Sequence, residues 1–204
     1  MKRMTELISK ALLTTIVCIM PLAASGETPD SSIVPKEATA LAMQYLHSVE
    51  SSTALPVDNG TGKDFIFVGK SRSPVGGWRI IAIDSNDKMR IAWDSFSLHD
   101  SYFDVIGLSY INIRADEHKG YIVTLRGCAP HQCADGKIGF AIYASREHQA
   151  YISHVSTQED DSYRVTYFPQ SGIPDAYRKE LDQMMCTDNG ISRPSTLPIK
   201  CAAQ

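Results

Sequence analysis

The sequence predicts an α+β protein built on an antiparallel β-sheet, with an N-terminal and a C-terminal helix flanking it. Apolar residues recur at three- and four-residue steps over residues 36–49, which predicts an amphipathic helix. Short β-rich runs separated by turn residues follow between 65 and 168, as in an antiparallel meander. A second helical stripe occupies 174–185. Helices at the ends of a run of strands are typical of the α+β class.

The N-terminus has the layout of a secretory signal peptide. Three basic residues lie before or at the start of an apolar run over 11–22, and small residues follow at 23–26. The run is too short to span a bilayer, and Cys18 fits a lipoprotein cleavage site poorly. We therefore expect residues 1–26 to be removed and the remaining chain to be a soluble periplasmic protein.

The composition favours one compact α+β domain over residues 27–204, since 43% of the chain is hydrophobic and 21% is charged. Three of the 20 basic and one of the 23 acidic residues belong to the predicted signal, which leaves 17 against 22, a formal charge of −5. This acidity argues against nucleic acid and anionic lipid as partners and mildly favours a basic protein. We expect no cofactor, and the sequence leaves the oligomeric state open, a homodimer included.

The first predicted helix begins after Pro35, which suits a first turn, and carries Leu41, Tyr45 and Leu46 on its apolar face. His47 would lie near its C-terminus, where a histidine is more often favourable to the helix dipole than functional. Residues 58–62 predict a turn-rich linker.

The strands are predicted to form one antiparallel meander. Asp84, Asn86 and Asp87 lie between two of the strand runs and suit a hairpin turn better than a calcium loop, because the required glycine and glutamate are missing. The last strand run is followed by the closing helix, whose inner face we expect to carry Tyr177 and Leu181. The predicted strand runs are 65–68, 78–83, 89–93, 105–113, 121–125, 138–143, 150–155 and 163–168.

Four cysteines remain after the predicted cleavage: Cys128, Cys133, Cys186 and Cys201. An even number in an exported chain indicates disulfides, and four cysteines permit three pairings. The pairing local in sequence, 128 with 133 and 186 with 201, is the simplest. It would pin the tail 186–204 to the closing helix.

The most distinctive motif is Cys128-Ala129-Pro130-His131-Gln132-Cys133. It lies between two strand-like runs, so we expect a hairpin tip that presents the imidazole of His131. A loop braced before binding loses less entropy when it meets a partner. Two other chemistries are weaker. Redox cysteine pairs are usually closer in sequence, and a metal held by Cys128, His131 and Cys133 would need reduced thiols in an oxidising compartment. We expect no catalytic residue and no metal site.

The Cys-x-Pro-His-x-Cys loop after a strand, with β-rich runs behind it, resembles the inhibitor of vertebrate lysozyme family. The resemblance covers about 121 to 155 and implies a periplasmic inhibitor with an inhibitor-like core over about 105–185. It implies that the loop enters the active-site cleft of a lysozyme, with His131 on the catalytic carboxylates, Pro130 as rigid support and Cys128–Cys133 as a bracing disulfide. Ala129 and Gln132 stand where the family has lysine and aspartate.

Two alternatives stay open. The chain could be an envelope adaptor or immunity protein directed at another cell-wall hydrolase. The cysteine pair could also simply staple a hairpin tip, with His131 an ordinary exposed loop residue.

Overall fold

The computed structural model describes residues 34–56, 62–72, 77–94, 107–117, 120–128 and 137–201. Within these ranges the chain forms two α-helices, nine β-strands and a short 3₁₀-helix. In chain order they are α1 (Lys36–Ala42), β1 (Leu46–Pro56), β2 (Lys63–Ser71), β3 (Trp78–Ile83), β4 (Met89–Asp94), β5 (Gly107–Ala115), β6 (Tyr121–Cys128), β7 (Ile138–Ala144), β8 (Gln149–Thr157), β9 (Tyr163–Phe168), α3 (Asp175–Thr187) and η2 (Pro194–Thr196).

The strands form two antiparallel sheets, where the sequence predicts one. Sheet A has the order β1-β2-β3-β4, and sheet B has the order β5-β6-β7-β8-β9. Each sheet is a simple meander in which every strand pairs with its neighbour along the chain. The mixed α+β class is as predicted, while the single sheet is a wrong expectation.

The two sheets pack face to face over a shared apolar core. Because side chains alternate along a strand, each sheet presents one set of large residues to the other. Sheet A contributes mainly β2, β3 and β4, and sheet B contributes mainly β6, β7 and β8. The buried members of this inter-sheet core are Ile66, Val68, Trp78, Ile80, Ala82, Trp93, Tyr121, Val123, Leu125, Ala141, Tyr143, Ala150 and Ile152.

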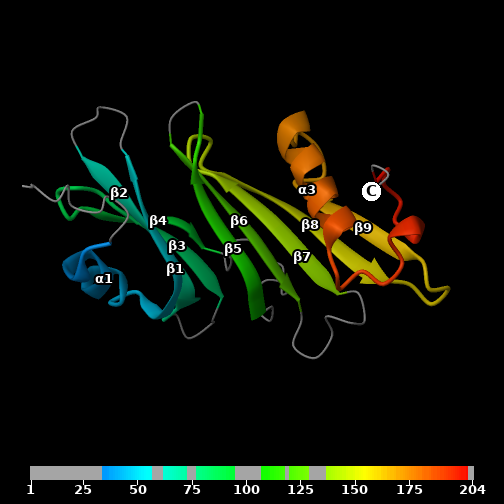
Figure 1. Cartoon of the computed structure of the whole chain (residues 1–204), viewed down its shortest axis with the longest axis horizontal. Coiled ribbons are helices and arrows are strands. Elements are labelled where there is room, and N and C mark those ends of the chain that lie inside the picture. Colours follow the sequence, from blue (N-terminus) through cyan, green and yellow to red (C-terminus); the bar gives the residue numbers. More distant parts are fainter. Residues whose placement is uncertain are drawn as a thin grey trace, which may run out of the picture.

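The two helices cover the outer faces of different sheets. Ala38 and Ala42 of α1 pack against Phe67 and Ile81 of sheet A. Leu181 of α3 belongs to the apolar cluster on the outer face of sheet B, together with the C-terminal tail. Figure 1 shows α1 beside β1–β4 and α3 on the opposite side of the molecule, over sheet B. Both faces of each sheet are therefore covered over part of their area.

The first predicted helix is too long. The helix ends at Ala42, and the rest of the predicted span enters β1, which pairs with β2 in a register that sets Thr53 opposite Ile66. The apolar spacing over 41–49 fits both structures, but the serines and the threonine after position 47 are poor helix formers and pair well in a sheet. His47 is accordingly an exposed residue of β1, not a group at a helix end.

The other predicted elements are largely confirmed. Every predicted strand run overlaps an observed strand, and the closing helix over 174–185 is α3. The turn after Ile83 is a hairpin turn, as predicted: Asp84 accepts hydrogen bonds from the backbone N–H groups of Asn86 at 2.8 Å and Lys88 at 3.0 Å. Asp87 in this turn has a φ of 58°.

Candidate functional site

The strands β6 and β7 carry the predicted binding loop. β6 ends at Cys128, β7 begins at Ile138, and these two residues are register partners. The antiparallel pairing of the two strand runs that flank the motif is therefore as the sequence predicts. The predicted contact residues Ala129, Pro130, His131 and Gln132, with Cys133, lie outside the described residues, as does the predicted signal peptide 1–26.

The root of this loop is buried. Cys128 is only 6% exposed and Ile138 is fully buried, and both belong to the apolar cluster under α3 and the tail. Cys128 is disulfide-bonded, and its partner lies outside the described residues. Burial on both faces of β6 and β7 leaves the ends of the loop little freedom to move.

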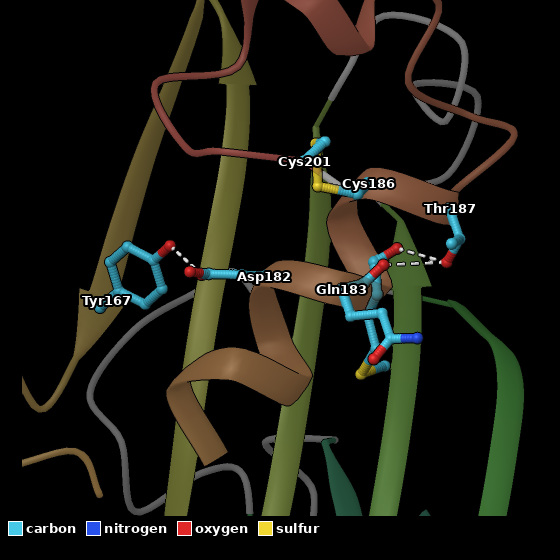
Figure 2. Close-up of a disulfide and its surroundings, with 7 residues drawn as sticks. Tyr167, Asp182, Gln183, Cys186, Thr187 and Cys201 are labelled. Atoms are coloured by element: carbon cyan, nitrogen blue, oxygen red, sulfur yellow. Dashed lines mark hydrogen bonds between the residues drawn. A yellow bond between two sulfur atoms is a disulfide. The ribbon is translucent and has the colours of Figure 1, made fainter. Parts of the chain in front are cut away.

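A second disulfide fastens the tail beside the loop root. Cys186 near the end of α3 is bonded to Cys201, with Cα atoms 5.5 Å apart, which confirms this part of the predicted pairing. Figure 2 shows the bond at the end of α3, with the hydroxyl of Thr187 turned back to the carbonyl of Gln183. The bond closes a segment of 15 residues, and Ile191 and Leu197 within that segment are buried in the same cluster as Cys128.

An ion pair joins the same tail to β6. The guanidinium of Arg126 donates from Nε to Asp188 Oδ2 and from Nη2 to Asp188 Oδ1 at 2.7 Å. The hydrogen bond to Asp188 raises the pKa of Arg126, and partial burial opposes this. Asp188 Oδ1 also accepts from the backbone N–H of Gly190 at 2.7 Å. A bidentate pair that is shielded from solvent fixes both the position and the orientation of the tail relative to β6.

Close packing at Gly190 completes the fit of the tail. A Cβ atom at this position would lie 2.8 Å from Arg126 Nη2 and 2.9 Å from Ile138 Cδ1. A larger residue would therefore push the tail away from the first residue of β7. Gly190 is thus a contact point between the tail and the loop root.

α3 itself is held on sheet B by polar contacts along its length. The hydroxyl of Tyr167 donates to Asp182 Oδ1 at 2.6 Å, and Arg178 lies 3.3 Å above the Tyr167 ring (Figure 2 shows the Tyr167–Asp182 contact). Burial, with the hydrogen bond to Asp182, raises the pKa of Tyr167. Further along, Arg114 of β5 pairs with Glu180 at 2.7 Å.

No local sequence pattern predicts the pairing of these positioning residues. Arg126 and Asp188 are 62 positions apart, so no local motif connects them. The one available signal is a charged residue, Arg126, inside an otherwise apolar strand, since a partly buried charge usually has a partner.

A shallow groove of about 490 Å³ lies next to the loop root on the α3 side of sheet B. Arg126 and Phe140, which are register partners, form part of its floor, and Tyr110 lies at its side with 49% of its surface exposed. The groove is completed by Met184, Thr187, Asp188 and Asn189.

Within the described residues, no group of three or more histidine, cysteine, aspartate or glutamate side chains is arranged to hold a metal ion. No helix in that part of the chain is long and apolar enough to cross a membrane.

His154, which no sequence argument singles out, is buried on the inner side of sheet B, with its ring 5.5 Å from that of Phe168. It is a core residue.

Comparisons with protein-family models, with curated proteins and with solved structures found no match to this chain.

Proposed function

We propose that this protein is an exported, non-enzymatic inhibitor of a lysozyme-like muramidase, and that it blocks the active-site cleft with the loop 128–133. The observation that supports the proposal is the register of β6 and β7, which sets Cys128 opposite Ile138, so that the motif begins where β6 ends. In this proposal His131 hydrogen-bonds the acidic groups of the cleft, Pro130 stiffens the loop, and Ala129 and Gln132 contact the rim. An imidazole has two nitrogens that can serve two acidic groups at once.

The surroundings of the loop root support this use. A loop that enters a cleft binds more tightly when its ends are already fixed, because less entropy is lost on binding. Here the strand ends are buried, and the tail beside them is fastened by Cys186–Cys201 and by the Arg126–Asp188 pair. The tail disulfide also suits an oxidising compartment such as the periplasm. The acidic mature chain suits a basic target enzyme.

The disulfide at Cys128 favours a binding role over the other chemistries considered for the motif. A bonded sulfur is neither a thiolate nucleophile nor a metal-ligating thiolate. The proposal therefore assigns Cys128 a bracing role.

The experiment is a titration of a C-type lysozyme acting on cell walls with the mature protein and with two variants. We expect stoichiometric inhibition by the wild type and at least a hundredfold weaker inhibition by His131→Ala, with an unchanged unfolding temperature. His47→Ala is the matched control, because His47 is an exposed histidine on sheet A, and it should inhibit like the wild type.

Two results would contradict the proposal. One is a wild-type protein that leaves lysozymes of several types fully active. The other is an envelope pull-down in which the captured enzyme is an amidase or a peptidase, which would point instead to an immunity or adaptor protein for another wall hydrolase.

A further inference from the structure

The inner face of sheet A changes character at one end. Along β2, β3 and β4 this face is apolar, with Ile66, Ala82 and Trp93 in the inter-sheet core. Side chains two positions apart lie on the same face of a strand, so Asp64 shares the face of Ile66, and Asp84 lies two positions beyond Ala82. Arg90 of β4 is the register partner of Ala82. Charged groups thus replace apolar ones at the margin of the core.

These residues line a pocket of about 300 Å³, which we call the inter-sheet pocket: Asp64, Ala82, Asp84, Lys88 and Arg90. This volume is at the lower end of the range typical of small-molecule sites. Its lining combines one small apolar residue with convergent charges of both signs, which is the pattern of a site for a small polar ligand rather than for an apolar one.

Sheet B supplies buried hydroxyl groups beside the same charges. Tyr121 is 2% exposed, and its Oη is buried beside the guanidinium of Arg90 and the hydroxyl of Tyr143. Its ring lies 6.1 Å from that of Tyr143. Burial raises the pKa of Tyr121, while the nearby guanidinium of Arg90 lowers it. A buried hydroxyl beside a guanidinium can donate a hydrogen bond to an anionic group that the guanidinium binds.

The charges in the inter-sheet pocket are not equally engaged by the protein. Asp84 accepts two backbone hydrogen bonds of its own turn, so it shapes the turn and positions Lys88. Arg90 lies 3.9 Å from Asp64, with 55% of its side chain exposed. By contrast, Arg79 and Asp94 in the same sheet are joined at 2.6 Å. The guanidinium of Arg90 is thus open to a further anionic group, with Asp64 a few ångströms away.

We propose that the inter-sheet pocket binds a small zwitterion of the size of an amino acid or a dipeptide. The ligand carboxylate pairs with Arg90 and Lys88 and accepts a hydrogen bond from the hydroxyl of Tyr121, and the ligand ammonium group pairs with Asp64. A guanidinium binds a carboxylate in a bidentate manner, which gives the site its orientation. This inference is independent of the loop 128–133.

The test is isothermal titration of the purified protein with glycine, L-alanine, D-alanine and alanyl-alanine. Acetate and ethylamine serve as probes that carry only one of the two charges. We expect at least one zwitterion to saturate the protein and both single-charge probes to bind at least about tenfold more weakly. Arg90→Gln and Asp64→Asn should each weaken the zwitterion at least about tenfold, and Tyr121→Phe about threefold.

Arg164→Gln is the control, since Arg164 is an exposed arginine on β9 of the other sheet, and it should bind like the wild type. Thermal unfolding of each variant checks that the fold is intact. The proposal is overturned if no zwitterion of the panel binds more tightly than about 10 mM. It is equally overturned if Arg90→Gln and Asp64→Asn bind as the wild type does.

Discussion

The outer faces of the two sheets are covered in different ways. On sheet A, the seven-residue helix α1 contributes two buried alanines to an apolar cluster around Phe67 and Ile81. On sheet B, the thirteen-residue helix α3 and the tail are fastened by a disulfide, by the Arg126–Asp188 pair and by the Tyr167–Asp182 hydrogen bond. Directional and covalent links are thus concentrated on the sheet that carries the predicted binding loop.

The difference indicates which property each region provides. Apolar packing stabilises a fold but tolerates small shifts, whereas charged hydrogen bonds and disulfides fix positions. On this view the covering of sheet A depends on apolar packing, and the end of sheet B near Cys128 gains rigidity from its covalent and directional links. Four changes test that comparison.

The largest effect is expected on sheet A, from Phe67→Ala. Phe67 is fully buried, so the variant loses its burial free energy and leaves a cavity, at a cost of about 4 kcal/mol. Urea unfolding monitored by circular dichroism measures the change. A loss below about 1 kcal/mol would mean that apolar packing is not what holds α1 on sheet A.

Removing the tail disulfide should follow in size. The double variant Cys186→Ser with Cys201→Ser removes the bond that closes a segment of 15 residues. The chain-entropy model gives a loss of about 3 kcal/mol in the free energy of unfolding. Hydrogen exchange should rise first in the tail and at the ends of β6 and β7, next to the loop root. Uniform exchange across both sheets would contradict a local fastening role.

Breaking the ion pair at the loop root should cost somewhat less. Asp188→Asn leaves the shielded guanidinium of Arg126 without its carboxylate, and we expect a loss of about 2 kcal/mol in the free energy of unfolding. The matched control is Asp161→Asn, because the Asp161–Arg193 pair is solvent-exposed and should contribute less than about 0.5 kcal/mol. If the two variants lose the same free energy of unfolding, the shielded Arg126–Asp188 pair stabilises the fold no more than the exposed Asp161–Arg193 pair does.

The smallest effect is a pH dependence that belongs to the α3 side. Burial, aided by hydrogen bonds to Asp182 and Glu147, raises the pKa of Tyr167 and of Tyr151 above the usual 10.0. Above pH 10 the unfolded chain releases these protons while the folded chain keeps them. The stabilisation is therefore complete below pH 10 and declines as the pH rises further.

This decline can be measured by urea unfolding between pH 8 and pH 11. Tyr167→Phe should make the free energy of unfolding fall less steeply with pH above pH 10. The reason is that the variant lacks one of the two phenolic protons whose release destabilises the fold. An unchanged slope in this variant would show that Tyr167 does not take part.

Local sequence pattern was sufficient for most of the secondary structure. Period-two runs and turn residues located all of the strands from β2 to β9, because each signal lies within a few neighbouring residues. The error at 43–49 has a local cause as well: Leu46 and Val49 satisfy helical spacing, and pairing with β2 decides in favour of a strand. The simplest of the three possible cysteine pairings, the one local in sequence, likewise predicted Cys186–Cys201.

The sequence by itself determined the α+β class, most of the elements and the position of the loop motif between two strands, and it offered the tail disulfide as the simplest cysteine pairing. Only the tertiary structure decided that the meander divides into two facing sheets, and that Arg126 reaches Asp188 across 62 residues. The reason is physical. Strand formation depends on alternation within one segment, whereas sheet partition and long-range ion pairs depend on which apolar faces cover one another, and this is settled only when the whole core is packed.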